Sequence, residues 1–416
     1  MSKPSPWTTK DAEDYYGFKR WGGNNFSVDP QGNLCVHPKG DHRKIRIADI
    51  IKEVEASGLK PPLTIRVQDM LRQVYCTQNR LTLPVSATGM AGMETCLVNL
   101  VEPGDKVLVF NAGYFATRML DVAARCGGEV HEVKLPWGQA FDPAQMRKEI
   151  DRVQPRVVGV VHAETSTGVL QPLDGLGEHC QKHGALLAID AVTSLACVPL
   201  ELDAWKVDAV YSCSQKGLAC PPGLSPVSFS ERALEKLHAR KSKVQSWYLD
   251  LSMITQYWTQ GSGARAYHHT APISANYALH EGLRIVLQEG LQARYKRHQV
   301  NHLALKAGLE AMGLRYVAPE GHRLPQLNAV YFPQGIEDLP IRKRMLEEFG
   351  IEIGGGLGEL AGKIWRIGLM GCNSRPDVVY TCLASLERCL IDAGVKVAPG
   401  TGVGAAQGEH ARLARV

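Results

Sequence analysis

Two residues in this sequence, Asp190 and Lys216, have the types and surroundings that a shared piece of chemistry would need. Asp190 ends the apolar run that begins at Leu186, and a carboxylate buried at a strand end stays ionised only beside a partner. Lys216 follows a second short apolar stretch and lies among serine, glutamine and glycine, where a lysine can serve as a Schiff-base nucleophile. Pyridoxal phosphate uses such a pair, because its aldehyde needs a lysine and its pyridinium nitrogen needs an acid.

Each candidate also has an ordinary structural interpretation. Considered singly, Lys216 could be a lysine of a surface loop and Asp190 an aspartate that caps the next turn. The cofactor hypothesis therefore depends on both residues occurring together. Val192 would point toward the same face as Asp190 and could cover the cofactor ring. Phe115 could stack on that ring or belong to the core. The hydroxyl of Thr165 suits the cofactor's phenolic oxygen, or forms a local turn.

Two stretches offer donors for a phosphate group. Thr88 stands at the N-cap of an expected helix, and the small residues 87–92 lead into it. Such a turn is either an anion site or plain strand-to-helix punctuation. Tyr267 and Thr270 carry hydroxyls that could also bind phosphate. The two histidines between them look like a metal pair, but no third ligand lies at useful spacing, so we expect no metal.

A charged residue, Arg366, interrupts the apolar run 364–368. Burying a guanidinium is costly unless it is paired, and its natural use is a bidentate clamp on a substrate carboxylate. A structural salt bridge is the alternative. The glycines 354–356 follow a strand without opening a helix, and they therefore form no dinucleotide fingerprint.

Short apolar strands alternate with helices over most of the chain, which predicts an α/β fold with a largely parallel sheet covered on both faces. The expected strands are 79–86, 106–110, 129–133, 157–162, 186–190 and 209–212. Ligands of such sheets lie at the carboxyl ends of strands. Thr88, Thr165, Asp190 and Lys216 each end or follow a strand, so we expect them to converge.

The remaining elements surround this sheet. We expect a hairpin over 26–36, a helix over 47–56, a loop-rich region over 221–275 and a long helix over 274–311. A smaller C-terminal domain follows, with strands at 327–332, 351–353 and 363–368 and helices at 341–349 and 377–394. The Gly- and Ala-rich residues from 398 onward are expected to be loosely held.

Composition sets the outer limits. The chain has 416 residues, 44% hydrophobic and 21% charged, which is ordinary for a globular protein. A net charge of +5 without a basic run among aromatics argues against nucleic acid, and the apolar runs are too short to span a membrane. Eleven cysteines without a CxxC pair, and an N-terminus without an apolar leader, indicate reduced thiols in the cytoplasm. The last three residues weakly imitate a peroxisomal signal.

From about residue 68 to residue 389, the chain resembles class V, fold-type I aminotransferases of the alanine–, serine– and ureidoglycine–glyoxylate group. The motifs that carry the resemblance are Leu97–Asp105, Glu164–Leu173, Asp190–Val192, Ser214–Lys216, Pro221–Gly223, Tyr267–Thr270 and Gly362–Gly368. The resemblance implies a large domain with a mostly parallel sheet and a smaller C-terminal α+β domain. It also implies a ping-pong exchange: alanine, serine or ureidoglycine gives its amine to pyridoxal 5'-phosphate, and glyoxylate takes it and becomes glycine.

The resemblance implies roles for single residues as well. Lys216 is the lysine that binds the cofactor, Asp190 the partner of its ring nitrogen, and Arg366 the arginine that binds a substrate carboxylate. Phe115 occupies the position of a stacking aromatic residue. Positions on the phosphate side match at Thr88, Gly89, Met90 and Gln215, and contacts from the partner subunit of a homodimer with shared active sites match at Tyr267 and Thr270.

The first 70 residues resemble a different family, the biosynthetic arginine decarboxylases, in the N-terminal segment of those enzymes. The resemblance rests on Tyr16, Trp21–Gly22, Val36–Pro38 and residues 58–66. Class V enzymes instead begin with a Gly- and Pro-rich segment that lines the substrate pocket and embraces the partner subunit. The chain therefore looks like a fusion with a junction near residues 63–72.

We accordingly expect four parts: a decarboxylase-like segment over 1–70, a large cofactor domain with a connecting helix over 71–310, a small domain over 311–397 and a tail over 398–416. Two alternatives to the glyoxylate aminotransferase stay open. One is another class V reaction, such as lyase chemistry, and the other is a catalytically impaired fusion. Besides the cytoplasm, the peroxisome and the mitochondrion stay open for a eukaryotic chain.

Overall fold

The computed structural model describes residues 7–18, 26–37, 44–56, 67–258 and 266–415, and the chain forms two units, Met1–Ile65 and Arg66–Val416. The first unit contains an antiparallel sheet in the order β1-β2-β3. Its elements are α1 (Thr9–Tyr15), β1 (Phe26–Val28), β2 (Leu34–Val36), β3 (Ile45–Arg46) and α3 (Ile47–Ala56). The expected hairpin and the helix after it are confirmed.

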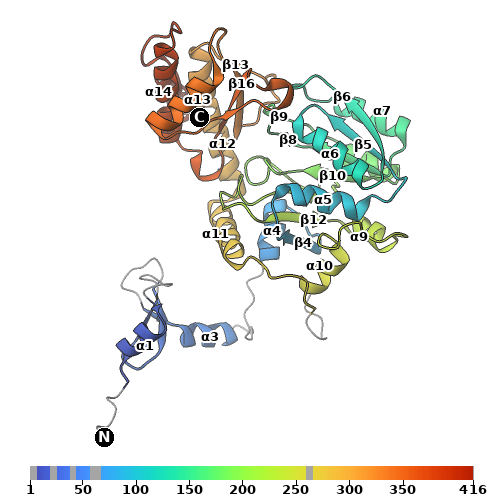
Figure 1. The fold of residues 1–416 in the computed structure, drawn as a ribbon, viewed down its shortest axis with the longest axis vertical. Coiled ribbons are helices and arrows are strands. Elements are labelled where there is room, and N and C mark those ends of the chain that lie inside the picture. Colours follow the sequence, from blue (N-terminus) through green and yellow to red (C-terminus); the bar gives the residue numbers. More distant parts are fainter. Residues whose placement is uncertain (1–6, 19–25, 38–43, 57–66, 259–265, 416) are drawn as a thin grey trace. The chain divides into compact units, whose positions relative to one another are not determined.

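A seven-stranded sheet forms the centre of the second unit, in the order β4-β12-β11-β10-β7-β5-β6 (Figure 1). Its strands are β4 (Leu81–Val85), β5 (Lys106–Asn111), β6 (Glu129–Lys134), β7 (Val157–Val161), β10 (Leu186–Asp190), β11 (Ala209–Tyr211) and β12 (Ser225–Phe229). Strand β12 runs antiparallel to both of its neighbours, whereas the pairs from β11 to β6 are parallel. The expected largely parallel sheet is therefore confirmed.

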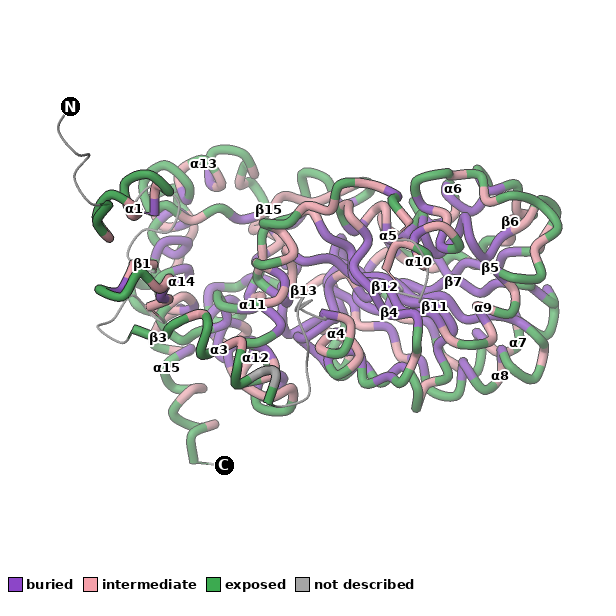
Figure 2. The backbone as a smooth tube through the Cα atoms, turned by 90° about the horizontal axis from the view of Figure 1, so that it is seen from below, coloured by how far each residue is buried: buried purple, intermediate pink, exposed green. Residues whose placement is uncertain are grey.

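Helices cover both faces of this sheet, because successive strand residues point to opposite faces. In β10, for example, Leu187 and Ile189 pack into one apolar core and Ala188 packs into the other. The first core is covered by α4 (Val67–Tyr75), α7 (Pro143–Val153), α8 (Leu176–Lys182) and α11 (Ile273–Glu289), and the second by α5 (Gly89–Leu100), α6 (Tyr114–Arg125), α9 (Glu231–His238) and α10 (Leu251–Trp258). Figure 2 shows the strands as buried segments between helices with exposed outer surfaces.

The C-terminal part of the second unit builds an antiparallel sheet with a core of its own, in which Trp365 is fully buried. Its strands, in the order β13-β14-β16-β15, are β13 (Arg315–Tyr316), β14 (Leu327–Tyr331), β15 (Gly354–Gly355) and β16 (Ile364–Gly368). The helices that accompany them are α12 (Leu291–Ala311), α13 (Asp338–Phe349), α14 (Pro376–Asp392) and α15 (Thr401–Leu413). Among the described helices, none is long and apolar enough to cross a membrane.

Three expectations about these elements were wrong in detail. The long helix expected over 274–311 is two helices, because Gly290 between them adopts a φ of +82°, which glycine tolerates. The strand expected at 351–353 lies at 354–355. The region 221–275, expected to be rich in loops, contains β12, α9 and α10. A proline is unusual in an inner strand because it has no N–H to donate. Pro226 of β12 lies directly opposite Pro84 of β4, so the two missing N–H groups fall at the same place between these strands.

The tail expected to be loosely held is instead an ordered helix, α15. The carboxylate of Glu387 accepts hydrogen bonds from the backbone N–H groups of Gly400, at 2.5 Å, and Gly402, at 2.7 Å, and so satisfies the start of that helix. A Cβ atom on Gly308 of α12 would lie 2.7 Å from the carbonyl oxygen of Gly402. The small residues therefore allow α12 and α15 to pack closely, and a Gly- and Ala-rich composition does not indicate a loosely held tail here.

Candidate active site

The first turn of α5 lies against the loops that follow β10 and β11. Gly89 begins α5, and a Cβ atom there would lie 3.2 Å from Cγ2 of Val192 and 3.0 Å from Cβ of Cys213. A residue without a side chain lets the helix approach this closely, with its free N–H groups at the carboxyl edge of the sheet. The structure thus brings Gly89 beside Val192, as expected for an anion site next to Asp190, while Met90 is partly buried against the core.

Asp190 is a buried carboxylate, 2% exposed, whose two oxygens are held by uncharged donors. Its Oδ1 accepts a hydrogen bond from the backbone N–H of Val192 at 2.8 Å, and its Oδ2 accepts one from the hydroxyl of Tyr211 at 2.7 Å. Burial raises the pKa of Asp190 to about 7 against the lowering effect of both hydrogen bonds, and the nearby Glu164 raises it further. A ligand that brings a positive charge or a proton would therefore bind favourably beside the Asp190 carboxylate.

Lys216 lies in a tight turn after β11 that the next residue makes possible. Its carbonyl oxygen accepts a hydrogen bond from the backbone N–H of Ala219 at 2.9 Å. A Cβ atom on Gly217 would lie 2.1 Å from the carbonyl oxygen of Leu195, so only glycine fits there. Burial raises the pKa of the Cys213 thiol to about 12, and the positive charge of Lys216 acts in the opposite direction.

Thr165 and Gln215 contribute polar groups at the same edge. The hydroxyl of Thr165 is buried and lies 2.8 Å from that of Thr193. Oε1 of Gln215 is buried without a hydrogen-bond partner among the described residues. An orphaned polar atom of this kind is uncommon unless a ligand completes it.

Arg366 extends from the middle of β16 and is partly buried. Its Nε donates to the carbonyl oxygen of Gly355 at 2.8 Å, and its Nη1 lies 3.5 Å from the carbonyl oxygen of Thr165. Burial lowers its pKa, and the charge of Glu164 raises it. Both bonds go to carbonyl oxygens, and no carboxylate of the described residues forms an ion pair with this guanidinium, as the structural alternative would require.

The sequence of residues 67–378 matches the profile of the family described as aminotransferase class V, three quarters of the chain. The chain belongs to this family. It is 38% identical over 348 residues to the (S)-ureidoglycine–glyoxylate transaminase of Bacillus subtilis, covering 79% of this chain and 83% of the relative.

Solved structures of related enzymes have the same fold. The alanine–glyoxylate aminotransferase of Nostoc sp. is 50% identical, with a TM-score of 0.76 over 78% of this chain and 85% of that structure. The ureidoglycine–glyoxylate aminotransferase of Bacillus subtilis is 39% identical, with a TM-score of 0.81 over 83% and 88%. This aminotransferase is therefore a fold-type I protein, as expected.

Class V aminotransferases use pyridoxal phosphate, and the residues at the strand ends fit that cofactor. Asp190, buried among neutral donors, suits a protonated ring nitrogen. The first turn of α5, opened by Gly89, suits a phosphate. The orphaned oxygen of Gln215 suits it only after rotation of the amide, which would turn Nε2 toward the phosphate, because phosphate oxygens accept hydrogen bonds.

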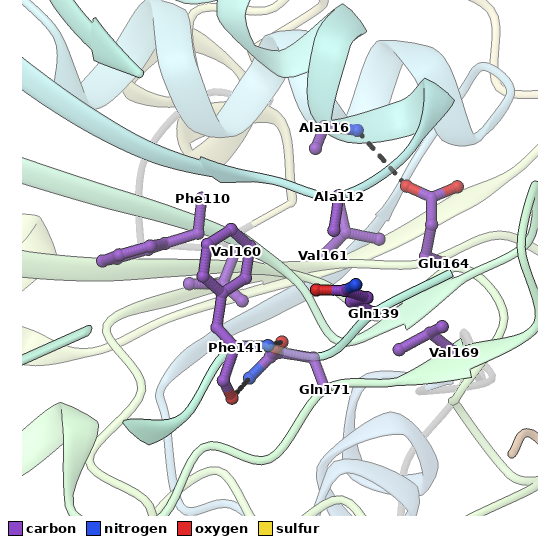
Figure 3. Close-up of a pocket in the computed structure, with 10 residues that line it drawn as sticks. All are labelled: Phe110, Ala112, Ala116, Gln139, Phe141, Val160, Val161, Glu164, Val169 and Gln171. Carbon is purple, nitrogen blue, oxygen red and sulfur yellow. Dashed lines mark hydrogen bonds between the residues drawn. The ribbon is translucent and has the colours of Figure 1, made fainter. Parts of the chain in front are cut away.

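A residue that the sequence analysis left without a role, Glu164, ties these segments together. Its Oε2 accepts from the backbone N–H groups of Phe115, at 3.2 Å, and Ala116, at 3.4 Å, in the first turn of α6. Figure 3 shows the bond from Ala116. Its Oε1 accepts from the backbone N–H of Ser166 at 3.0 Å and from its hydroxyl at 2.6 Å. A Cβ on Gly113 would lie 2.3 Å from Cγ of Glu164. The buried carboxylate thus fixes the backbone at Phe115, whose side chain is partly buried, relative to the loop of Thr165 and Ser166.

Three of the residues expected to contact phosphate are exposed in the single chain. Thr88 is exposed, and its hydroxyl makes no capping bond to α5. Tyr267 is 77% exposed, and its hydroxyl lies 3.1 Å from that of Thr270, which is also exposed. The segment that carries them is anchored by Nε2 of His269, 2.7 Å from Oγ of Ser86.

Proposed function

We propose that this aminotransferase transfers the amino group of a small amino acid to glyoxylate, with Asp190 and Lys216 as its central residues. The observation that carries the proposal is the buried Asp190 carboxylate, held by Val192 and Tyr211 at the carboxyl edge of the sheet. The relatives named for alanine or ureidoglycine with glyoxylate support the acceptor.

The charged residues divide the work as follows. Pyridoxal phosphate, when bound, supplies the electron sink that makes the Cα–H bond of an amino acid acidic. Asp190 would keep a proton on the ring nitrogen, because an unpaired charge at its buried position is unfavourable. Lys216 would hold the cofactor through its amine, and the same amine would move the proton at Cα of the substrate as a general base and acid.

The remaining residues bind and orient. Phe115, held through its backbone by Glu164, would stack on the ring, and Val192 would cover its other side. Thr165 would donate to the phenolic oxygen, and Thr88, Gly89, Met90 and Gln215 would hold the phosphate. Arg366 binds a carboxylate, which the amino donor and glyoxylate have in common, and one residue can therefore serve both half-reactions.

We further propose a homodimer in which Tyr267 and Thr270 reach the phosphate bound by the partner subunit. Their hydroxyls lie 3.1 Å apart and both residues are exposed in the single chain, so they are free to reach a neighbouring subunit. The eleven cysteines are free, which supports a reducing compartment, the cytoplasm. We also propose that the second unit divides into a large domain that ends at residue 310 and a small domain over residues 311–397.

Borohydride reduction of the purified, cofactor-loaded chain tests this function. We expect a reduced cofactor on Lys216, found by peptide mapping, and turnover of alanine, serine or ureidoglycine with glyoxylate as acceptor. Label on another lysine, or none, would refute the assignment of Lys216. Label on Lys216 without transfer to glyoxylate, but with release of ammonia or another fragment, would favour the lyase. Label without any turnover would favour the impaired fusion.

A further inference from the structure

Three potential metal ligands meet on the surface of α7 and α8. Asp151 lies near the end of α7, His179 in the last turn of α8 and His183 at the C-cap of α8. The spacing of four residues places both imidazoles on one side of α8. Among the described residues they form a group whose ligand atoms all lie within 4.8 Å of one another.

The distances in this group match the spacing of ligands around one ion. Oδ1 of Asp151 lies 2.7 Å from Nε2 of His179 and 3.0 Å from Nε2 of His183. Bonds of about 2.1 Å from Zn²⁺ to nitrogen or oxygen place neighbouring ligands roughly 3.0 Å apart at right angles and roughly 3.4 Å apart at tetrahedral angles. The two distances from Asp151 are thus within a few tenths of an ångström of the spacing at right angles, and the two imidazole nitrogens lie within 4.8 Å of each other, so the side chains must draw closer to share an ion.

We propose that Asp151, His179 and His183 bind a divalent transition-metal ion such as Zn²⁺. Two imidazoles and one carboxylate favour zinc, cobalt or nickel over magnesium or calcium, which prefer oxygen ligands. The side chain of Asp151 is half exposed, so water can complete the coordination and the ion can enter from solvent. Nε2 of Gln154 lies 3.4 Å from Nδ1 of His183, and rotation of this amide would let its oxygen accept from the Nδ1–H and orient that ligand.

The ion would join two helices that sit on the face of the sheet away from α5 and α6. Helix α7 leads into β7 and α8 leads into β10, whose last residue is Asp190. The site is therefore structural: it ties together the supports of the strands that carry the active site, without contacting the reaction. Ligand spacing could not have shown it, because Asp151 and His179 are 28 residues apart in the sequence.

Cobalt binding to the metal-stripped full-length chain tests the proposal. Cys76 and Cys372 are exposed and should be alkylated first, because thiolates also bind cobalt. We expect one Co²⁺ per chain by calorimetry, with visible absorption bands and no thiolate charge-transfer band. Zn²⁺ should raise the melting temperature of the chain, since an ion that binds only the folded state stabilises it.

Variants decide between this site and general surface binding. Asp151→Ala and His179→Ala should each weaken binding at least about tenfold, the factor seen even when only the surroundings of a metal site change. The matched control is His131→Ala. Nε2 of His131 lies 2.9 Å from Glu129, and this pair belongs to no group of three potential metal ligands among the described residues. Equal affinity in the wild type and in both site variants, or an equal loss in the His131 variant, would overturn the proposal.

Discussion

Tyr211 donates its hydroxyl hydrogen to Oδ2 of Asp190 across two neighbouring parallel strands, at 2.7 Å. The two residues are register partners in β10 and β11, and both are almost fully buried. The bond fixes the carboxylate in one orientation and stabilises its charged form, since a donor favours the group that accepts from it. Tyr211 is thus a positioning residue for the proposed contact to the cofactor's ring nitrogen.

Tyr211→Phe should weaken binding of pyridoxal phosphate by about tenfold to hundredfold, because a hydrogen bond to a charged group is worth roughly 1.5–3 kcal/mol. Equilibrium dialysis of the cofactor measures the change. Tyr75→Phe is the matched control, since the equally buried Tyr75 donates to the carbonyl oxygen of Pro226. If both variants lose the same affinity, the effect belongs to core packing and not to Asp190.

Asp190→Asn should change how the stability of the cofactor-free chain depends on pH. The folded-state pKa of Asp190, about 7, lies above its ordinary value of 3.8, so the folded wild type gains stability from the bound proton at low pH. That gain is lost as the pH rises to about 7. Relative to the wild type, the variant should therefore gain about 3 kcal/mol between pH 5 and pH 8. Urea unfolding at both pH values measures the difference, and parallel pH profiles would contradict the prediction.

Glu164→Gln should loosen the loop that holds Phe115. The amide oxygen can still accept, but the amide nitrogen faces N–H donors that the carboxylate satisfied. We expect the free energy of unfolding to fall by about 1–3 kcal/mol and kcat/KM to fall with it. Glu132→Gln is the control, because Glu132 is exposed and accepts one bond from Asn111, at 2.6 Å. A variant with lower stability and unchanged kcat/KM would show that Glu164 has a purely structural role.

Two glycine-to-alanine substitutions should have opposite effects. Gly217→Ala puts a Cβ atom 2.1 Å from the carbonyl oxygen of Leu195, so the loop of Lys216 must shift. We expect a loss of about 2 kcal/mol or more in stability and a weaker hold on the cofactor. Gly408→Ala has no atom within 4 Å and lies on the exposed side of α15, where it should stabilise the helix by about 0.5–1 kcal/mol. Thermal unfolding and cofactor titration of both variants compare them directly.

The sequence predicted the parts of the fold that depend on local pattern. Buried strands such as 157–161 and 186–190 have continuous apolar runs, and their order along the chain implies a parallel sheet with its ligands at one edge. Asp190 could be identified for the same reason, because an acid at the end of such a run is conspicuous. Strand β12 was missed, since Pro226 and two serines hide its apolar pattern.

What the sequence could not show depends on packing between distant segments. The role of Glu164 arises from four donors, two of which come from α6, about 50 residues earlier. Helix α15 was missed because a segment rich in glycine and alanine gives no clear helix signal by itself. The helix is held by contacts with Glu387 and α12, which the local sequence does not show. Whether Tyr267 and Thr270 are exposed depends likewise on how distant segments pack around them, which no local sequence pattern reveals.

The role of Arg366 gives the sharpest test of the substrate assignment. Its guanidinium is held by Gly355 through Nε, which leaves other N–H donors for a ligand. Arg366→Ala should raise KM for the amino donor and for glyoxylate alike, each by about tenfold to hundredfold, because both substrates carry a carboxylate. Steady-state kinetics with each substrate varied in turn measures the two values. Arg344→Ala is the control, since Arg344 pairs with Glu348 at 2.7 Å on α13 and should affect stability without moving either KM. An increase in KM for only one substrate would place the carboxylate of the other at a different residue.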